Sequence, residues 1–502
     1  MKEIKQLFFL VATLGFCVLV NGAAAQTFKV VHAFSSVDPN IATNSDGAFP
    51  DGGLALSEKT IYGTTGAGGN SGMGTVFKMN LDGSGFVTLH SFSLTSGHFP
   101  YYTNTDGAAP LGITVSDGTA FGVTRQGGAF GSGTVFRIGT NGSSFSTVHH
   151  FSALSTNNPN GNADGARPSG SLLLVGDTLY GTTERGGSSD GGVVFSLTRD
   201  GSTFAVLHDF TCSVEESGCA FDGGEQPESG VILLGDTLYG TTYAGGLGGN
   251  PSLLPFGTAF ALHTNGTFKT LFTFVLNQCD FPPCYNSNGL NPSGGLVSDG
   301  TTVYGMTYGG GLSNSGTIFA IGKDGTGFRT VHIFSTLSSG NTRTNSDGAF
   351  PYGNSVTLIG STLFGTANQG GGLGLGTVFS VHTDGSGFTT LHSFSGTSDG
   401  ANPTAWLTLA GNTLYGTTIA GGQKDNGTIF SITVKPELTI THQLESVILS
   451  WPTNFTGFTL QSTTNIVSPI WTTVSASPVA VNGQNTVTAA ISGAEKFYRL
   501  SQ

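Results

Sequence analysis

Short apolar runs alternate with glycine-rich polar turns along residues 27 to 434, and they recur with a fixed period. Each period holds four runs rich in Val, Ile, Thr, Phe and Tyr and bounded by Gly, Asp or Asn, a pattern typical of β-strands joined in hairpins. In the second copy the runs are Leu111–Ser116, Thr119–Thr124, Gly133–Ile138 and Phe145–Phe151. The pattern predicts four antiparallel strands per copy, named A to D in chain order.

Four phrases mark the copies, and each phrase occurs seven times. Asp-Gly-Ala-x-Pro precedes strand A, Tyr-Gly-Thr-Thr lies in strand B, Gly-Thr-Val-Phe in strand C and Leu-His-x-Phe in strand D, each with variants. The Phe residues that close strand C are spaced 59, 59, 65, 59, 60 and 51 residues apart. Tandem copies of one four-stranded unit predict an all-β fold, a seven-bladed β-propeller.

The two ends of the repeat region complement each other. Phe28–Phe34 reads as a strand D with no strand A, B or C before it, and the seventh copy ends near Val434 without a strand D. We expect Phe28–Phe34 to lie beside Gly427–Val434 and to close the ring in blade 7, because an open ring would leave exposed sheet edges.

The order of the strands also predicts on which face of the propeller each loop lies. In a propeller, D–A and B–C connections share one face, and the D–A connections here are long and varied, with the aromatic stretch 99–102 in one of them. The B–C loop of the fourth copy carries an insertion within Gly245–Phe256. Because variable loops on a rigid scaffold usually carry function, this face is the predicted functional face.

The combination of Leu-Tyr-Gly-Thr-Thr, Gly-Thr-Val-Phe, Asp-Gly-Ser-Gly-Phe and Leu-His-Ser-Phe resembles the GloVer tandem repeats of exported bacterial proteins, over roughly residues 27–434. The resemblance implies a propeller with a C-terminal anchor that varies among members. It implies no particular activity.

The N-terminus has the pattern of an export signal. Lys2 and Lys5 precede an apolar run, Phe8–Val20, and Ala23–Ala25 offers a cleavage site before Gln26. Residues 1–25 are therefore predicted to be a signal peptide of a secreted or cell-surface protein. A retained membrane anchor is the alternative, but the run is short for a membrane span. We expect no membrane span after cleavage.

The period stops at Val434, and residues 437–502 follow a different pattern. Six strands are predicted, with Trp451 and Trp471 anchoring a small core, in a fibronectin-III-like or immunoglobulin-like sandwich. They cover Leu438–Thr441, Ser446–Trp451, Gly457–Gln461, Ile470–Val474, Asn485–Ile491 and Lys496–Leu500. The predicted domains are thus residues 1–25, 26–434 and 437–502.

Composition narrows the class of protein. Charged residues make up 10% and hydrophobic residues 37% of the chain, which argues against disorder. The net charge is −12 without a basic stripe, which argues against nucleic-acid binding. The cysteines beyond the signal form two local pairs, which favour Cys212–Cys219 and Cys279–Cys284 disulfides in an exported chain. Other pairings stay open, and a zinc site is disfavoured because its spacing is atypical.

The aspartates of Asp-Gly-Ala-x-Pro are candidate ligands because the repeat would place one before each strand A. A carboxylate ring there would bind Ca²⁺ or a basic ligand group. The favoured interpretation is a turn, because an Asp side chain can bond its own backbone and the phrase recurs in every copy. The residues are Asp46, Asp106, Asp164, Asp222, Asp347 and Asp399, with Asn288 in the fifth copy. The strand-D histidines lie in different copies and are predicted to be packing residues.

The remaining candidates are loop residues suited to carbohydrate. Aromatic loop residues that a sugar ring would stack on are Phe99, Tyr101, Tyr102, Phe281, Tyr285 and Tyr352. Candidate carboxylates for glycoside chemistry are Glu184, Glu215, Glu216, Glu225 and Glu228. No nucleophile elbow is predicted, because the repeats predict no helix to follow a G-x-S-x-G turn. We predict an exported, monomeric, non-catalytic protein without a cofactor, binding an extracellular glycan or protein. The alternatives are a propeller enzyme acting on polysaccharide and a structural or adhesive surface protein.

Overall fold

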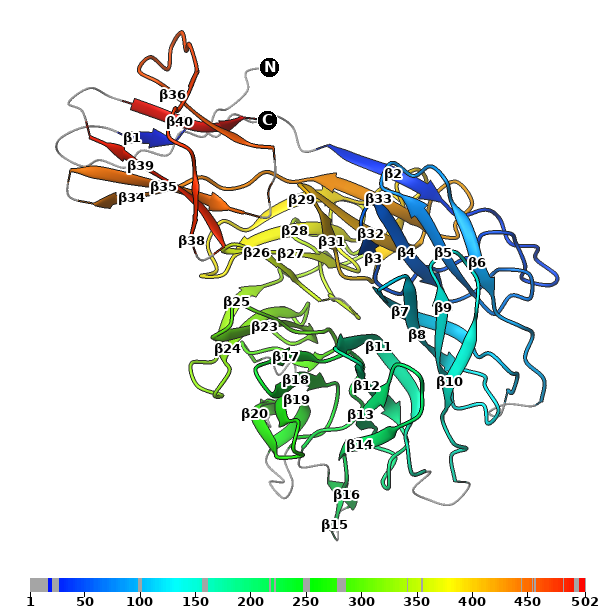
Figure 1. Cartoon of the computed structure of the whole chain (residues 1–502). Coiled ribbons are helices and arrows are strands. Elements are labelled where there is room, and N and C mark those ends of the chain that lie inside the picture. Colours follow the sequence, from blue (N-terminus) through cyan, green and yellow to red (C-terminus); the bar gives the residue numbers. More distant parts are fainter. Residues whose placement is uncertain are drawn as a thin grey trace.

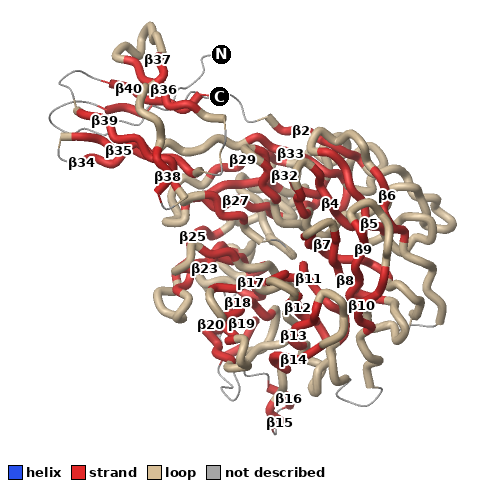
Figure 2. The backbone as a smooth tube through the Cα atoms, in the orientation of Figure 1, coloured by secondary structure: helices blue, strands red, loops and turns tan. Residues whose placement is uncertain are grey.

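The computed structural model describes residues 17–19, 27–97, 102–155, 161–215, 218–220, 223–246, 253–277, 286–340, 342–353, 355–443, 445–453, 455, 457–481, 483–491 and 496–501. These residues form strands and turns and contain no helix, as the all-β prediction requires (Figures 1 and 2). In Figure 1 the sheets of the repeat region follow one another around a common centre.

The first three copies each form one four-stranded antiparallel sheet in the order A, B, C, D. The first sheet contains β3 (Ala55–Ser57), β4 (Thr60–Thr65), β5 (Thr75–Asn80) and β6 (Val87–Ser91). The second contains β7 (Ala108–Ser116), β8 (Thr119–Gln126), β9 (Thr134–Gly139) and β10 (Ser146–His150). The third contains β11 (Ala166–Val175), β12 (Thr178–Arg185), β13 (Val193–Thr198) and β14 (Phe204–Asp209). The four strands predicted for the second copy are confirmed within a few residues.

The later copies follow the same order, with strand A split in two in the fifth and seventh. The fourth sheet contains β17 (Ile232–Leu234), β18 (Thr237–Thr242), β19 (Leu253–His263) and β20 (Phe268–Asn277). The fifth contains β21 (Leu290–Pro292), β22 (Val297–Ser298), β23 (Thr302–Gly309), β24 (Thr317–Gly322) and β25 (Arg329–Ile333). The sixth contains β26 (Thr357–Ile359), β27 (Thr362–Ala367), β28 (Thr377–His382) and β29 (Thr389–Ser393). The seventh contains β30 (Ala401–Pro403), β31 (Thr408–Ala410), β32 (Thr413–Ala420) and β33 (Thr428–Thr433).

The strand missing from the seventh copy comes from the other end of the chain. Strand β2 (Phe28–Ala33) pairs antiparallel with β33, with Phe28 opposite Ile432 and Ala33 opposite Thr428. This pairing confirms the expected partner of the N-terminal strand.

The repeated phrases are explained by contacts between copies. The Gly that opens strand C has a positive φ, 96° at Gly74, and a Cβ there would lie 2.5 Å from Cδ of Pro110 in the next copy. The same contact joins the seventh copy to the first, where a Cβ on Gly427 would lie 2.7 Å from Cδ of Pro50. Glycine and the Pro of Asp-Gly-Ala-x-Pro therefore specify one close approach between neighbouring sheets.

The strand-D histidines join the copies a second time, by stacking. His90 stacks on Phe145 of the next copy with ring centroids 3.7 Å apart. Strand β2 takes part on both sides, because Phe28 stacks on His392 at 3.6 Å and His32 stacks on Phe86 at 4.0 Å. The prediction that these histidines serve packing is confirmed.

The C-terminal segment forms two further sheets. One has the order β34 (Thr439–Gln443), β35 (Ser446–Pro452), β39 (Gln484–Ala490), β38 (Val479–Val481). The other has the order β1 (Cys17–Leu19), β40 (Lys496–Ser501), β36 (Thr459–Thr463), β37 (Thr472–Thr473). Trp451 is buried in their shared core. The prediction for Trp471 is wrong, because its ring is partly exposed and lies 4.3 Å from the guanidinium carbon of Arg499.

The C-terminal segment also packs against the repeat region. Phe455 is buried in a cluster with Ile359 and Phe364 of the sixth copy. At the N-terminus, β1 falls within the predicted signal peptide and pairs in parallel with β40. Among the described residues, no helix has the length and apolar character to cross a membrane.

Candidate functional site

The aspartates of Asp-Gly-Ala-x-Pro lie at the corner between strand D and the next strand A. At Asp106, Oδ2 accepts hydrogen bonds of 3.0 Å from His90 Nε2 and 3.0 Å from the backbone nitrogen of Ser93, while Oδ1 accepts one from the Ser93 hydroxyl. The other described aspartates of the phrase have the equivalent His and Ser partners, at Asp46, Asp164, Asp347 and Asp399. We name each such group an Asp–His–Ser corner.

The corners hold charged carboxylates. Burial alone would raise the pKa of Asp106, but the hydrogen bonds from His90 and Ser93 outweigh it and keep the pKa below its usual value. The same balance lowers the pKa of the other four. Each carboxylate accepts hydrogen bonds from the histidine and serine of its own corner. The described residues contain no group of three or more His, Cys, Asp or Glu side chains placed to hold a metal ion.

Several predicted residues lie outside the described part of the chain, and their roles stay predictions: Asp222, Tyr101, Tyr285, Cys279 and Cys284. Tyr102 lies in a D–A connection with 38% of its surface exposed. Cys212 precedes a small hairpin, β15 (Ser213–Glu215) and β16 (Gly218–Ala220), and Cys219 lies in β16. The Cys212–Cys219 disulfide therefore also stays a prediction.

The structure brings together a different set of residues, where strand B ends and strand A begins. The residue after Tyr-Gly-Thr-Thr and the residues flanking the Pro differ from copy to copy. After the strand-B phrase they are Gly66, Arg125, Glu184, Tyr243, Tyr308, Asn368 and Ile419, and after the Pro they are Asp51, Leu111, Ser169, Glu228, Ser293, Tyr352 and Thr404. We name Asp51, Arg125, Glu184, Tyr243, Glu228, Tyr308 and Tyr352 the convergent cluster.

The backbone at this point is held in an uncommon conformation. The residue before the Pro has a positive φ in all seven copies: Phe49, Ala109, Arg167, Gln226, Asn291, Phe350 and Asn402 have φ between 51° and 58°. In the third copy its N–H donates a hydrogen bond of 2.8 Å to the carbonyl of Ser132 in the preceding copy. A conformation that non-glycine residues rarely adopt is thus stabilised by the neighbouring sheet.

Arg125 is the cation at the centre of the convergent cluster. Its guanidinium forms an ion pair and hydrogen bond with Glu184 of the next copy. Arg167 Nη1 lies 3.9 Å from the other carboxylate oxygen of Glu184. The charge of Arg125 also acts on Asp51, Glu228 and Tyr352. With Glu184, side chains from four other copies lie within electrostatic reach of one guanidinium.

Two carboxyl groups of the cluster, those of Asp51 and Glu228, form no ion pair with any described residue. Burial raises the pKa of Asp51 to about 6, although the charge of Arg125 acts in the opposite direction. Burial and the nearby Glu184 raise the pKa of Glu228 to about 7. Asp51 Oδ1 is buried without a hydrogen-bond partner among the described residues. Both groups can donate or accept a proton near neutral pH.

Aromatic rings complete the cluster on the side of the fifth and sixth copies. The ring centroid of Tyr308 lies 5.1 Å from that of Phe350 and 5.5 Å from that of Tyr352. Burial and the charge of Glu228 raise the pKa of Tyr352 to about 12, so its hydroxyl remains a hydrogen-bond donor at neutral pH. Tyr352 is 39% exposed, which leaves part of its surface accessible to a ligand.

A cavity of about 470 Å³ begins at the cluster and follows the strand-A segments of the third to seventh copies. We name it the strand-A cavity. Glu228 and Trp406 line it, together with small and apolar residues such as Ser171 and Val231. Ser171 Oγ is a second buried polar atom with no partner among the described residues; the others are Oγ1 of Thr64, Thr404 and Thr417. Unpaired buried polar atoms are uncommon in folded proteins. Ser171, Thr64 and Thr417 lie on strands A and B, and Thr404 lies between the two halves of strand A in the seventh copy.

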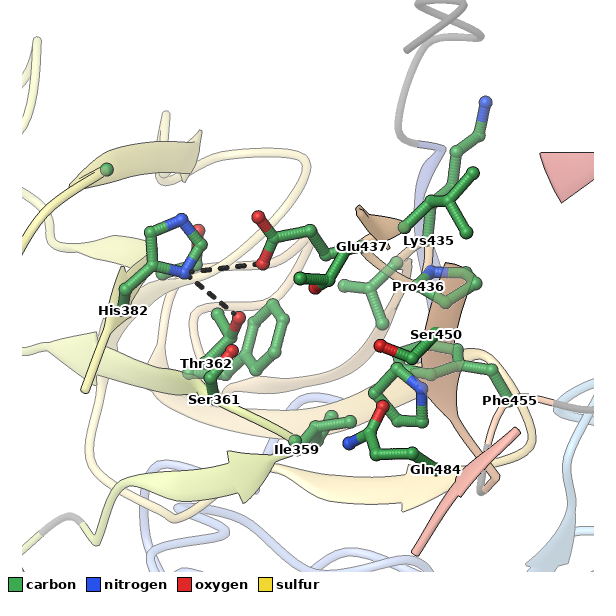
Figure 3. A pocket seen from close by; sticks show the side chains of 18 of the residues that line it. Ile359, Ser361, Thr362, His382, Lys435, Pro436, Glu437, Ser450, Phe455 and Gln484 are labelled. Atoms are coloured by element: carbon green, nitrogen blue, oxygen red, sulfur yellow. Dashed lines mark hydrogen bonds and ion pairs between the residues drawn. The ribbon is translucent and has the colours of Figure 1, made fainter. Parts of the chain in front are cut away.

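A second, larger cavity of about 900 Å³ lies between the sixth copy and the C-terminal segment (Figure 3). His382 Nδ1 faces Oγ1 of Thr362 at 3.3 Å and Oε2 of Glu437 at 3.6 Å across its wall. Glu437 belongs to the segment that links the two regions, and Pro452 contacts Gly360. This cavity is the seam along which the C-terminal segment packs.

Sequence reasoning named Glu184, Glu228 and Tyr352 as candidates but missed Asp51, Arg125 and Trp406. The other predicted glutamates are elsewhere: Glu225 lies beside the Arg185–Asp190 ion pair, and no side-chain position is described for Glu215 or Glu216. The sequence does contain a signal for these positions. When the seven copies are aligned, the residue after Tyr-Gly-Thr-Thr varies in charge and size between copies, whereas the phrase itself is repeated.

A family model described as the Gloeobacter/Verrucomicrobia repeat matches residues 18–162, 101–283, 158–346 and 333–457, and the chain belongs to this family. No curated protein sequence is detectably similar to the chain. An oligogalacturonate lyase from Vibrio parahaemolyticus is a similar solved structure, with 10% identity, a TM-score of 0.43 and coverage of 82% of this chain and 97% of the other. A putative 6-phosphogluconolactonase from Bacteroides fragilis has 13% identity, a TM-score of 0.43 and coverage of 72% and 88%. These likenesses carry nothing about chemistry.

Proposed function

We propose that this Gloeobacter/Verrucomicrobia repeat protein is an exported, non-catalytic binding protein that holds carbohydrate at the convergent cluster. The observation that supports the proposal is the cluster itself: charged and aromatic side chains from six copies meet where the scaffold phrases end. Because the copies agree in their phrases and differ here, the cluster is the place where a ligand would be recognised.

The proposal includes a closed ring of seven blades. The Gly–Pro contact continues from the sixth copy to the seventh and from the seventh to the first. The stacking of a strand-D ring on the next copy continues from the sixth copy through β2 to the first. In such a ring the convergent cluster lies at the D–A and B–C face around the axis, where six of the seven copies contribute one or two residues.

Carbohydrate is the ligand class that matches this chemistry. Sugar hydroxyl groups donate hydrogen bonds to carboxylates and accept them from Arg and Tyr, and the apolar face of a sugar ring stacks on aromatic rings. Glu184 is held by two arginines, which leaves Asp51 and Glu228 free to accept hydrogen bonds from a ligand. A nucleic acid is disfavoured as the ligand, because these carboxylates and the net charge of −12 would repel its phosphates.

Export is part of the proposal and rests on the pattern of residues 1–25. Cleavage after Ala25 would remove β1 and leave β40 as an edge strand of the C-terminal sheet. We infer that residues 437–502 act as a small sandwich that packs on the sixth copy through Phe455.

The test is calorimetric titration of the purified protein with soluble plant, algal and bacterial oligosaccharides. We expect one saturable site, weakened at least about tenfold by Glu228→Gln, because a charged hydrogen-bond acceptor is lost. Glu58→Gln, an exposed glutamate in the turn between β3 and β4, is the matched control and should leave binding unchanged. Absence of binding across the panel would contradict the proposal and favour a structural or adhesive role.

A second candidate function is hydrolysis of a polysaccharide at the same cluster. The specific observation in its favour is the pair of raised carboxyl pKa values, about 6 at Asp51 and about 7 at Glu228, since glycoside hydrolysis needs one protonated and one ionised carboxyl group. If a bound glycan is cleaved, reducing ends accumulate and the rate shows a bell-shaped pH profile that Glu228→Gln abolishes. If the glycan binds but no reducing ends are released, hydrolysis is excluded and only the binding function is supported.

A further inference from the structure

We propose that the strand-A cavity is a subsite for the end of a carbohydrate chain, with the indole of Trp406 as its stacking platform. The inference rests on the proposed function and adds to it where the terminal sugar residue lies. It also assigns a role to a residue outside the convergent cluster.

Trp406 occupies a position that is small in every other copy. The strand register identifies this position as two residues before the partner of the strand-B aromatic residue, as Gly53 is before Ala55, the partner of Tyr62. The corresponding residues in the other copies are Gly112, Ser171, Gly230, Gly295 and Ser355. The seventh copy alone places a large aromatic side chain there.

The small residues allow the strand-A segments to approach one another closely. A Cβ on Gly230 would lie 2.4 Å from the carbonyl oxygen of Ser171, and one on Gly53 would lie 1.9 Å from Cε2 of Trp406. The indole therefore lies directly on the backbone of the first copy. Trp406 also lines the strand-A cavity, so the indole both packs on Gly53 and borders the cavity.

The cavity also supplies a polar partner. Glu228 lines it together with Trp406 and lies at its boundary with the convergent cluster. A volume of about 470 Å³ falls within the range of about 300–1,000 Å³ for small-molecule sites. A terminal sugar residue would cover the indole with its C–H face and direct hydroxyl groups toward Glu228.

Ordered water is the competing occupant, because water also fills polar cavities and can bind a carboxyl group such as that of Glu228. Water alone does not account for the indole, which offers a large apolar face and a single N–H donor. The two occupants make different predictions for a variant in which Trp406 is replaced by the glycine that other copies carry.

The experiment measures ligand affinity and tryptophan emission for the wild-type protein, Trp406→Gly, Trp406→Phe and Glu228→Gln, using the oligosaccharide that binds best in the titration panel. We expect the bound oligosaccharide to shift the emission of the wild type. Trp406→Gly should lose affinity by about 10-fold to 100-fold, as hot-spot aromatic residues do, and Trp406→Phe should retain most of the affinity but lose the emission change. The unfolding temperature of each variant shows whether the fold is intact.

The outcomes separate the subsite from the proposed function. If Glu228→Gln weakens binding while Trp406→Gly binds as tightly as the wild type, the convergent cluster binds glycan but the subsite is refuted. If Trp406→Gly binds more tightly, Trp406 obstructs the cavity and the subsite is likewise refuted. If no oligosaccharide binds the wild type, both proposals fail together. If Trp406→Gly unfolds, Trp406→Phe decides by its emission change.

Discussion

The Asp–His–Ser corners and the convergent cluster both contain partly buried carboxyl groups, but the surroundings shift the pKa values of these groups in opposite directions. In the corners a carboxylate accepts hydrogen bonds from its own histidine and serine, and its pKa is lowered. In the convergent cluster Asp51 and Glu228 are partly buried without a histidine or serine partner among the described residues, and their pKa values are raised. The corners recur from copy to copy, while the residues of the cluster vary between copies. Residues that recur in the copies therefore belong to the scaffold, and residues that vary between the copies form the candidate site.

The largest effect should come from removing the strand that joins the ends of the repeat region. Deletion of residues 27–34 removes Phe28, His32 and Phe34, which contact the sixth, seventh and first copies. Loss of one buried Phe costs about 3–5 kcal/mol, so the deletion should abolish the cooperative unfolding transition of the repeat region. Calorimetry checks this, and an unchanged transition would show that β2 is dispensable to the scaffold.

Breaking one corner should cost less. Asp347→Asn weakens the bonds that the carboxylate accepts from His332 and Ser335, and we expect a loss of about 1–3 kcal/mol in the free energy of unfolding. His442→Ala, at an exposed histidine of β34, is the control and should stay within about 0.5 kcal/mol of the wild type. Denaturant titration at pH 7 measures both. If Asp347→Asn strengthens carbohydrate binding or stability, the corner is not scaffold.

The corners and the convergent cluster should change the free energy of unfolding with pH in opposite directions. The pKa of Asp347 is lower in the folded than in the unfolded state, so its contribution is present above the unfolded value of about 3.9 and is lost as the pH falls through the folded value. The pKa of Glu228 is raised to about 7, so the folded state binds the extra proton and stability falls as the pH rises from about 4 to 7.

Glu228→Gln tests that sign directly. The variant cannot ionise, so it should match the wild type near pH 4 and exceed its free energy of unfolding at pH 8 by about 1–3 kcal/mol, while ligand binding is weakened. Unfolding curves across this pH range provide the measurement, with Glu58→Gln as the control. A variant less stable than the wild type at pH 8 would place Glu228 among the scaffold residues.

The smallest effect on stability should come from the aromatic edge of the cluster. Tyr352→Phe removes a partly exposed hydroxyl and keeps the ring beside Tyr308, so unfolding should change by less than about 0.5 kcal/mol. Carbohydrate affinity should still fall, because a sugar hydroxyl loses its partner. An affinity equal to that of the wild type would restrict the role of Tyr352 to packing.

The sequence was sufficient for the scaffold because the scaffold is what repeats. The period predicted the four strands of each copy, and the unmatched strand at Phe28 predicted its pairing with the last copy. The cluster was harder, because single residues such as Arg125 and Asp51 carry no local pattern and meet only where sheets distant in sequence come together. Trp406 lies between the two halves of strand A, away from the long loops where aromatic residues were sought. Trp471 was placed in a core because tryptophan is usually buried, whereas Arg499 covers its ring at the surface.

The most direct test of the account is a crystal structure of the protein with a bound oligosaccharide. The account predicts sugar density that touches Glu228 and Tyr352 in the convergent cluster and ends on the indole of Trp406. Density at an Asp–His–Ser corner, or in the cavity beside His382 and Glu437, with the convergent cluster empty, would contradict it.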